Sequence, residues 1–316
     1  MDYQIEFTDK EITPWAGILM LKKMLDRMDF DGCLEDLNLP EQGSNRGYSS
    51  EQLIKQFMTS VWCGANKFEH TEVTRQDEVL RQFWGFERMA GHKSFQRFFN
   101  KFDQATNQKV FTPLYQWFFR NLQFNNFTLD VDSTIHTRYG NQQGAKKGYN
   151  PKKPGRLSHH PLMAFVAETK MVANFWLRSG DSYTSNNIEA FLDDTFEKLQ
   201  GKKVGLFRAD SGFYDKKVLE YLEQRSINYI VAVRLYAPVQ QLIASHKTWQ
   251  RLSDGIEVAE STYQSPLWNK PRRIVMIRQH VPTRPKAAGR SLKLFQDEGI
   301  YKQYRYSCFI TSLDLP

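Results

Sequence analysis

The sequence has few cysteines, no long apolar run and no basic leader, and each of these absences excludes a class of protein. Its three cysteines, Cys33, Cys63 and Cys308, are far apart and form no CxxC pair, so neither a zinc site nor a disulfide framework is indicated. No apolar run reaches the roughly 18 residues that a membrane-spanning helix needs, and the first residues are polar and acidic. We therefore expect a soluble cytoplasmic protein.

Acidic residues are absent from two long tracts, residues 133–167 and 261–296. The chain of 316 residues has 43 Lys and Arg against 35 Asp and Glu, a formal charge of +8. A cationic surface without carboxylates favours the phosphate backbone of nucleic acid, because each bound phosphate releases counterions. A solvated basic face is the alternative for either tract. The residues expected to contact DNA are Arg138, Lys146, Lys147, Lys152, Lys153, Arg156 and His159 in the first tract, and Arg272 and Arg273 in the second, which also holds Lys270, Arg278, Arg284, Lys286, Arg290 and Lys293.

Residues 1–125 are expected to form a helical DNA-binding region. In the run SFQRFFNKF, residues 94–102, four phenylalanines recur at the i, i+3, i+4, i+7 spacing of one buried helix face, with Ser94 suited to be the N-cap. The other face carries Arg, Asn and Gln, which make bidentate contacts to base edges, so this is a candidate recognition helix. A solvated face over an aromatic core is the alternative. The outward residues are Lys93, Gln96, Arg97, Asn100 and Lys101.

Between residues 126 and 235 the pattern changes to strands alternating with helices. We expect strands at 127–135, 160–168, 171–178, 203–209 and 228–234, and helices at 185–199 and 214–225. The second and third strands are too close for a crossover, so they form an antiparallel hairpin, whereas the later strands run parallel to the first. This order predicts a mixed α/β fold of the RNase H-like type. Residues 236–316 are expected to form a β-rich insertion, with runs at 256–263, 272–281 and 304–311.

Two aspartates lie where this fold would bring them together. Asp132 is on the first strand, in FTLDVDSTIH, and Asp210 follows the fourth, in VGLFRADSGFYD. Paired carboxylates at a strand end suit Mg²⁺ or Mn²⁺, which take oxygen ligands and leave positions for water and phosphate. Two such ions activate a water or a 3′-hydroxyl in phosphodiester chemistry. Asp at a strand end is also common turn chemistry, and His159 and His160 are candidates for metal binding, phosphate contact or packing.

Residues 130–134 also match the DxDxT nucleophile motif of haloacid-dehalogenase-like phosphatases. In that family Asp130 would be the covalent nucleophile and Asp132 the general acid, with Asp210 and Asp215 echoing a later acidic motif. The expected hairpin argues against this alternative, because those phosphatases have a helical crossover after the motif. The long helical region before the motif and the cationic loop after it argue against it too.

The order of several motifs resembles that of DDE-type insertion-sequence transposases, most closely the thirteen-eighty family. The motifs are LDVDST, GAKKGYNPKKPGRLSHHPL, LRSGDSYTSNN, and FRADSGFYDKKVLEYLE followed by NYIVAVRL. The resemblance implies that Asp132 and Asp210 are the first two members of a catalytic, metal-binding acidic triad. It also implies an N-terminal region that binds terminal inverted repeats and a β-rich insertion in the RNase H-like fold. Because cut-and-paste chemistry needs both ends held together, we expect a homodimer on double-stranded DNA, both the element ends and the target.

The sequence departs from the family's pattern at the third acid. Relatives carry it as a Glu in a spaced Tyr, Arg, Glu, Lys arrangement that this chain does not contain. The chain stops at TSLDLP, where relatives begin that helix, so we expect a truncated transposase that is inactive on its own. A remnant that only binds DNA is the alternative function. The role of Asp130 stays open: it shares a sheet face with Asp132 and either supports the site or is a turn residue.

Overall fold

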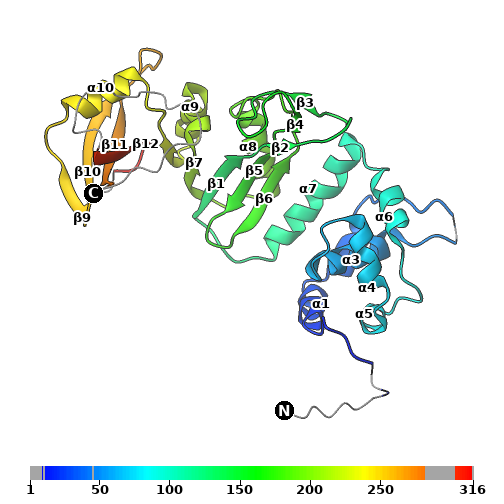
Figure 1. Cartoon of the computed structure of the whole chain (residues 1–316). Coiled ribbons are helices and arrows are strands. Elements are labelled where there is room, and N and C mark those ends of the chain that lie inside the picture. Colours follow the sequence, from blue (N-terminus) through cyan, green and yellow to red (C-terminus); the bar gives the residue numbers. More distant parts are fainter. Residues whose placement is uncertain (1–8, 10, 45, 282–302, 315–316) are drawn as a thin grey trace, which may run out of the picture. The chain divides into compact units, whose positions relative to one another are not determined.

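The structure is a computed structural model that describes residues 9, 11–44, 46–281 and 303–314. The chain divides into two compact units, Met1–Leu122 and Gln123–Pro316. The first unit is helical and the second is built on a large mixed sheet (Figure 1). Within the described ranges, no helix has both the length and the apolar character needed to cross a lipid bilayer.

The described residues of the first unit confirm the helical character expected for the N-terminal region. Several of its helices begin at a side-chain cap: Ser49, Asp77 and Asp103 each accept a hydrogen bond from the backbone N–H three residues further on. Each cap satisfies an N–H group that a helix start leaves unpaired. The sequence therefore sets these starts locally. The elements are α1 (Ile18–Arg27), α2 (Phe30–Asp36), α3 (Ser50–Trp62), η1 (Phe68–His70), α4 (Thr71–Arg75), α5 (Glu78–Phe83), α6 (His92–Phe99) and α7 (Gln104–Arg120).

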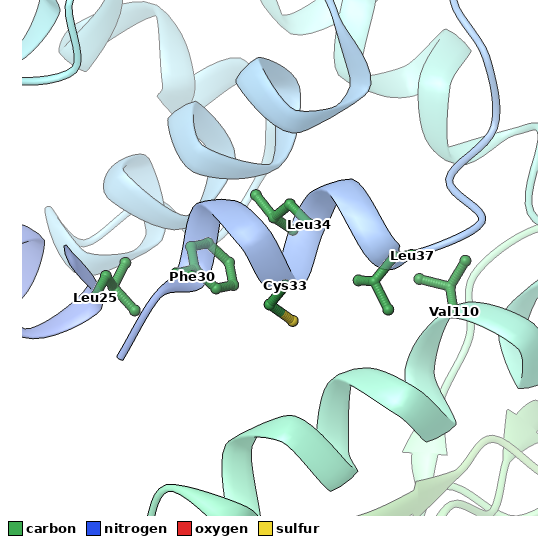
Figure 2. Close-up of a cluster of buried hydrophobic side chains, with 6 residues drawn as sticks. All are labelled: Leu25, Phe30, Cys33, Leu34, Leu37 and Val110. Atoms are coloured by element: carbon green, nitrogen blue, oxygen red, sulfur yellow. The ribbon is translucent and has the colours of Figure 1, made fainter. Parts of the chain in front are cut away.

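Two buried apolar clusters hold the helical unit together. The first joins α1, α2 and α7; in Figure 2 Cys33 points from α2 toward α7, whereas Leu34 points to the opposite side of α2. The second contains Phe95 and Phe98, two of the four phenylalanines with helical spacing. Burial raises the pKa of the Cys33 thiol to about 11, so that this side chain stays protonated and packs as an apolar group. The first cluster consists of Leu25, Phe30, Cys33, Leu34, Leu37 and Val110.

The second unit is organised around a nine-stranded sheet of order β6-β5-β1-β7-β8-β12-β11-β10-β9. Strand β1 is antiparallel to β5 and parallel to β7, β5 and β6 form a hairpin, and β8 is parallel to β7. This confirms the predicted RNase H-like order, in which helices α8 (Ile188–Lys198) and α9 (Lys216–Gln224) lie between the later strands in the chain. The strands are β1 (Phe127–Ser133), β5 (Leu162–Val166), β6 (Met171–Trp176), β7 (Val204–Ala209) and β8 (Asn228–Ala232).

Strand β1 is the central strand of this core, and its two faces differ. Phe127, Leu129 and Val131 are buried, while the alternate positions carry Asp130 and Asp132. Because successive side chains of a strand point to opposite faces, the apolar residues anchor β1 in the core and direct both carboxylates to the other face. The next strand of the sheet after β1 is the antiparallel β5, which forms a hairpin with β6, whereas the phosphatase alternative requires a helical crossover to a parallel strand at this point.

The β-rich segment continues the same sheet. Strand β12 pairs antiparallel with β8, and β11, β10 and β9 follow in order. The three β-rich runs expected from the sequence are therefore strands, and they extend the edge of the RNase H-like core (Figure 1). The elements are α10 (Ala237–Ser245), β9 (Gln250–Ser253), β10 (Ile256–Tyr263), β11 (Arg272–His280) and β12 (Tyr304–Thr311).

A buried ion-pair cluster connects this segment to helix α9. Glu223 of α9 accepts hydrogen bonds from Arg272 of β11 at 2.8 and 3.0 Å, from the Tyr229 hydroxyl at 2.8 Å and from Lys270 at 3.0 Å. The Arg272 guanidinium also lies over the Trp268 ring, 4.6 Å from its centre. Arg272 is only 5% exposed, so its charge depends on Glu223 for compensation.

Candidate metal and DNA site

Asp132 lies on β1 and Asp210 directly follows the neighbouring strand β7. The parallel register of β1 and β7 pairs Asp130 with Arg208 and Val131 with Ala209. The next positions along the two chains are Asp132 and Asp210. Neighbouring strands are about 4.8 Å apart, so two residues seventy-eight positions apart in the sequence come side by side at one edge of the sheet.

Both carboxylates are exposed and are oriented by local backbone groups. Asp132 Oδ1 accepts a hydrogen bond from the Ser133 N–H at 2.7 Å, and Asp210 Oδ1 accepts one from the Gly212 N–H at 2.8 Å. Gly212 is required by a close approach: a Cβ there would lie 2.7 Å from the Thr184 methyl and 2.9 Å from Asp210 Oδ1. Neither aspartate forms an ion pair with a described Lys, Arg or His, so both retain oxygens for a ligand.

Asp130 is engaged differently from Asp132. Arg208 binds it through two parallel hydrogen bonds of 2.7 Å, one to each carboxylate oxygen. The Asp130 hydrogen bond raises the pKa of the Arg208 guanidinium further, which keeps the pair charged. This cross-strand pair lies beside Asp132 and Asp210 on the same sheet face, so Asp130 is a neutralised neighbour of the two free carboxylates.

The residues present fit a divalent cation that has oxygen ligands. Mg²⁺ is typically held by one or two carboxylates, with water and substrate phosphate filling the other positions, and Asp132 with Asp210 supplies that kind of donor set. Nowhere in the described residues do three or more His, Cys, Asp or Glu side chains gather closely enough to form a larger metal cluster. The two aspartates are therefore the candidate ligands on this part of the chain.

The first acid-free tract forms a small ordered surface after β1. Strands β2 (His136–Thr137), β4 (Leu157–His159) and β3 (Lys146–Lys147) form a separate three-stranded sheet of order β2-β4-β3, which the sequence did not predict. Lys146 pairs with Asp181 at 3.2 Å, and Lys153 lies over the Tyr139 ring, 5.1 Å from its centre. Lys147, Lys152 and Arg156 are exposed and form no ion pair with any residue that the structure describes; Arg156 also lies over the Tyr139 ring, 6.0 Å from its centre. These three cations remain available to phosphate.

His159 and His160 are packing residues in the structure. His159 is buried, receives a hydrogen bond from Arg138 Nε at 2.9 Å and contacts the Gln143 carbonyl oxygen at 2.9 Å. Both its ring nitrogens are thereby occupied, and Arg138 is turned toward it. His160 is buried as well and contacts Ser133, next to Asp132. Neither histidine is placed to face DNA phosphate.

The described cations of the second acid-free tract are neutralised within the protein. Arg272 and Lys270 pair with Glu223, Arg273 with Glu260 and Arg278 with Glu257. Each of these acids lies outside the tract in the sequence. The positive charges of the tract are therefore balanced by carboxylates that other elements supply. We do not include Arg272 or Arg273 in the proposed DNA surface. Arg284, Lys286, Arg290 and Lys293 lie outside the described residues.

Helix α6 carries two of the three cations predicted on the helical unit, Lys93 and Arg97, and the third, Lys101, lies in the turn after it. Lys93, Arg97 and Lys101 are exposed, as expected for the outward face. Lys101 donates to the Glu41 carbonyl oxygen at 2.5 Å and Arg97 Nε donates to the Lys93 carbonyl oxygen at 3.2 Å, so the outward face is ordered. The N-cap assignment of Ser94 was wrong, because α6 begins two residues earlier, at His92.

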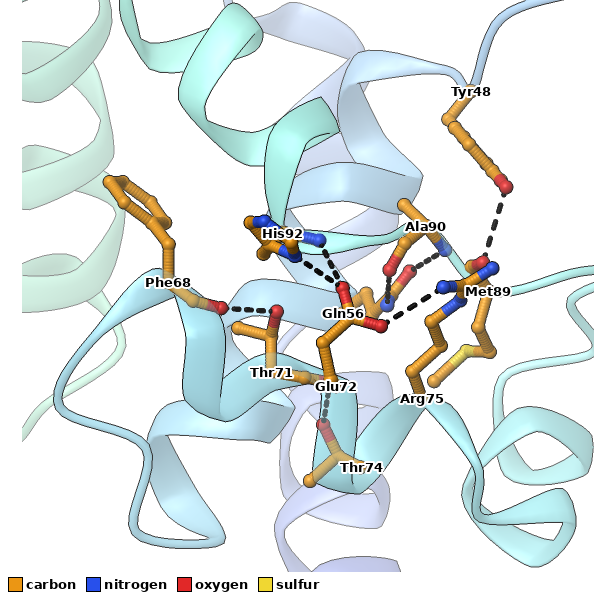
Figure 3. A network of polar contacts seen from close by, with 10 residues as sticks. All are labelled: Tyr48, Gln56, Phe68, Thr71, Glu72, Thr74, Arg75, Met89, Ala90 and His92. Atoms are coloured by element: carbon orange, nitrogen blue, oxygen red, sulfur yellow. Dashed lines mark hydrogen bonds and ion pairs between the residues drawn. The ribbon is translucent and has the colours of Figure 1, made fainter.

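The start of α6 is set by a carboxylate from another helix. Glu72 Oε1 of α4 accepts hydrogen bonds from the His92 backbone N–H and from His92 Nδ1, each at 2.7 Å, and Arg75 donates to Oε2 at 2.9 Å (Figure 3). Nearby, Gln56 forms reciprocal 2.7 Å hydrogen bonds with the N–H and carbonyl of Ala90. These contacts fix the direction of α6 relative to α3 and α4.

Replacing Glu72 by Ala is expected to destabilise the helical unit by about 1 kcal/mol, the usual cost of losing a helix cap. The His92 backbone N–H, together with Arg75, lowers the pKa of Glu72 to about 2. The stabilisation is therefore complete above the unfolded pKa of about 4.5 and is lost as pH falls toward 2. Urea unfolding between pH 2 and 7 measures this. Asp26→Ala, at an exposed pair with Lys22, is the control and should cost about 0.3–0.5 kcal/mol; an equal loss for both variants would contradict the capping role.

A comparison with protein families identifies the chain. The family model described as transposase DDE domain group 1 matches residues 2–305. The chain belongs to this family. No curated protein sequence matches it.

Solved transposase structures are similar to this DDE-domain chain at low identity. A piggyBac transposase synaptic complex with hairpin DNA is 12% identical, with a TM-score of 0.46; 94% of this chain and 59% of that chain are covered. A Mos1 mariner paired-end complex with Mn is 11% identical, with a TM-score of 0.25 and 66% of both chains covered. The DDE-domain chain thus spans about three fifths of the piggyBac chain.

Two features of the site were not found from the sequence. One is the segment of residues 178–187, which contacts the ends of both aspartate-bearing strands. The other is a close backbone contact between two loops: a Cβ on Gly148 would lie 1.8 Å from the Gly180 carbonyl oxygen. The glycines in GAKKGYN and LRSGDS were visible signals of tight backbone, but nothing in the sequence identified their partners.

Proposed function

We propose that this chain is the DNA transposase of a bacterial insertion sequence of the thirteen-eighty family, acting in the cytoplasm as a homodimer on double-stranded DNA. The observation that carries the proposal is the parallel pairing of β1 and β7, which brings Asp132 on β1 next to Asp210 at the end of β7 in an RNase H-like sheet. In this proposal residues 1–125 bind the terminal inverted repeats, residues 126–235 form the catalytic core and residues 236–316 form the β-rich insertion.

Asp132 and Asp210 would hold Mg²⁺ or Mn²⁺ ions through their exposed oxygens. When bound, such ions activate a water or a 3′-hydroxyl and stabilise the leaving oxygen of the phosphodiester. The protein orients the two carboxylates through the Ser133 and Gly212 N–H groups. It also keeps Asp130 paired with Arg208, so that the local negative charge is concentrated on the two candidate ligands.

The exposed cations of strand β3 and of the connection from β3 to β4 would bind the DNA backbone beside these carboxylates. Replacing Lys147, Lys152 and Arg156 together by Gln is expected to weaken duplex binding and to flatten the slope of log affinity against log salt by about 2 to 3, since each phosphate contact contributes about 0.9. The matched control replaces Arg273 and Arg278, which are ion-paired with Glu260 and Glu257. Fluorescence anisotropy at several salt concentrations measures both, and an equal effect of the two sets would contradict the assigned surface.

The proposed function is tested with a duplex that carries the inverted repeats bordering the encoding gene. Preferred binding to this duplex over a scrambled one, followed by Mg²⁺-dependent cleavage that Asp132→Asn abolishes, supports a catalytic transposase. Absence of any preference for the element ends would contradict the proposal, and so would cleavage that persists in Asp132→Asn.

The second candidate function is binding of the element ends without cleavage. One observation favours it: in the described residues no third His, Cys, Asp or Glu joins Asp132 and Asp210 to complete a triad. Preferred binding to the end duplex with no cleavage in Mg²⁺ or Mn²⁺ would support this candidate over the catalytic one. In that case the chain occupies the element ends without cutting them.

A further inference from the structure

The segment that follows strand β6, residues 178–187, lies against the ends of both aspartate-bearing strands. On one side, Thr184 Oγ1 is 3.3 Å from the hydroxyl of Ser133, the residue after Asp132. On the other side, the Thr184 methyl packs close to Gly212: a Cβ built on Gly212 would lie only 2.7 Å from it. The N–H of Gly212 donates a hydrogen bond to the Asp210 carboxylate. Thr184 therefore contacts the neighbours of both candidate metal ligands.

Arg178 fixes the backbone of this segment. Its Nη1 donates to the carbonyl oxygens of Tyr183, Thr184 and Asn186 at 3.1, 3.2 and 2.9 Å, and its Nε donates to the His160 carbonyl oxygen at 3.1 Å. Arg178 is 8% exposed. Burial lowers the pKa of its guanidinium to about 10, so it stays charged at neutral pH. A buried cation that binds several carbonyls of one turn holds that turn in a single conformation.

His160 connects the segment of residues 178–187 to Ser133, and its hydrogen-bond partners indicate its tautomer. Nδ1 is 2.7 Å from the Ser182 carbonyl oxygen, which only accepts, so Nδ1 carries the proton. In the neutral ring, Nε2 then accepts the hydrogen of the Ser133 hydroxyl at 3.1 Å. Because the Ser133 hydroxyl then donates its hydrogen bond to His160, the Thr184 hydroxyl is the donor in the hydrogen bond between Thr184 and Ser133. These directions are those of the neutral His160 ring.

We infer that His160, Ser133 and Thr184 form a bridge that holds the Asp132 and Asp210 strand ends in register, and that His160 is a positioning residue for the metal site. The inference rests on the proposed function, since it takes the two aspartates as metal ligands. Ser133 connects the bridge to the metal site. Its N–H orients the Asp132 carboxylate, and its hydroxyl forms hydrogen bonds with His160 and Thr184. Loss of the bridge leaves both ligands present but less well ordered.

The test measures Mn²⁺ affinity by isothermal titration on the full 316-residue chain. Ser133→Ala and Thr184→Val each remove one hydroxyl of the bridge, and His160→Gln removes the ring. Each is expected to weaken Mn²⁺ binding by about 10- to 100-fold, the usual effect of losing a group that orients a ligand. Ser133→Ala combined with His160→Gln should be no weaker than the weaker single variant, because both remove the same hydrogen bond.

Three controls separate positioning from general stability. Ser182→Ala and Tyr183→Ala alter side chains of the same segment, whose carbonyls rather than side chains bind His160 and Arg178. Tyr221→Phe removes a 2.6 Å hydrogen bond to Asp193 elsewhere in the same unit. All three should keep wild-type Mn²⁺ affinity, even where the melting temperature falls. A loss of affinity that follows the melting temperature across all variants would overturn the inference.

Two further outcomes distinguish failure of the inference from failure of the proposed metal site. Unchanged Mn²⁺ affinity in Ser133→Ala and Thr184→Val, with binding lost in Asp132→Asn, would overturn the inference and leave the proposed function intact. Unchanged affinity in Asp132→Asn would overturn the metal site itself, and the inference with it.

Discussion

Replacing either Asp132 or Asp210 by Asn is expected to weaken Mn²⁺ binding by about 100-fold or more, because removing a ligand costs at least as much as removing a group that orients one. Asn keeps the size of the side chain and one oxygen acceptor but loses the negative charge that a hard divalent cation requires. The two single variants should be similar, since Asp132 on β1 and Asp210 directly after β7 each follow one residue of the last pair of the two strands, Val131 and Ala209. Isothermal titration with Mn²⁺, or electron paramagnetic resonance of free Mn²⁺, measures the effect.

Asp130→Asn is the matched control for this prediction. Asp130 lies two residues before Asp132 on the same sheet face, but its two oxygens are bound by Arg208. We expect Mn²⁺ affinity in Asp130→Asn to fall far less than in Asp132→Asn. An effect of Asp130→Asn equal to or larger than that of Asp132→Asn would contradict the assignment of Asp132 as the metal ligand. It would favour the phosphatase alternative, in which Asp130 of the DxDxT motif is the reactive residue.

Replacing Glu223 by Gln is expected to lower the free energy of unfolding of the sheet-containing unit by about 3–5 kcal/mol, the usual cost of breaking a buried ion pair. The variant leaves Arg272 buried without a countercharge and weakens the contacts of Lys270 and the Tyr229 hydroxyl. Burial alone would raise the pKa of Glu223, but the hydrogen bonds from Arg272, Lys270 and Tyr229 outweigh it and lower the pKa to about 2. The pair's stabilisation is thus complete above the unfolded pKa of about 4.5 and is lost as pH falls toward 2.

Urea unfolding followed by circular dichroism measures this change, with Glu260→Gln as the control. Glu260 pairs with Arg273, the residue beside Arg272, but its side chain is 47% exposed, so its loss should cost about 1 kcal/mol or less. Similar costs for the two variants would show that the Glu223 cluster does not join helix α9 to the β-rich segment in the way described.

Local patterns in the sequence were sufficient to predict the core of the fold. Alternation of apolar residues identified β1, and the short link between residues 166 and 171 identified the β5–β6 hairpin. The spacing of Phe95 and Phe98 identified α6, but its start was misplaced. The reason is that the capping carboxylate, Glu72, lies twenty residues earlier on another helix, where no local rule points to it.

The charged surface was harder to predict, because ion pairing is a long-range property. The acid-free tract around Arg272 suggested a phosphate-facing surface, yet Glu223, 49 residues away, folds against it. His160 is a similar case: its position before a strand was visible, but its contacts with Ser133 and Ser182 depend on three separate segments meeting. The sequence therefore identified the candidate metal ligands but not the residues that hold them in place.

The most direct test of the central claim is a crystal structure of the chain grown with Mn²⁺, with anomalous diffraction data collected near the manganese absorption edge. We expect an anomalous peak that is bound by carboxylate oxygens of both Asp132 and Asp210, as is usual for a hard divalent cation with oxygen ligands. Manganese bound at another place, for example at His159, with Asp132 and Asp210 both unoccupied, would contradict it.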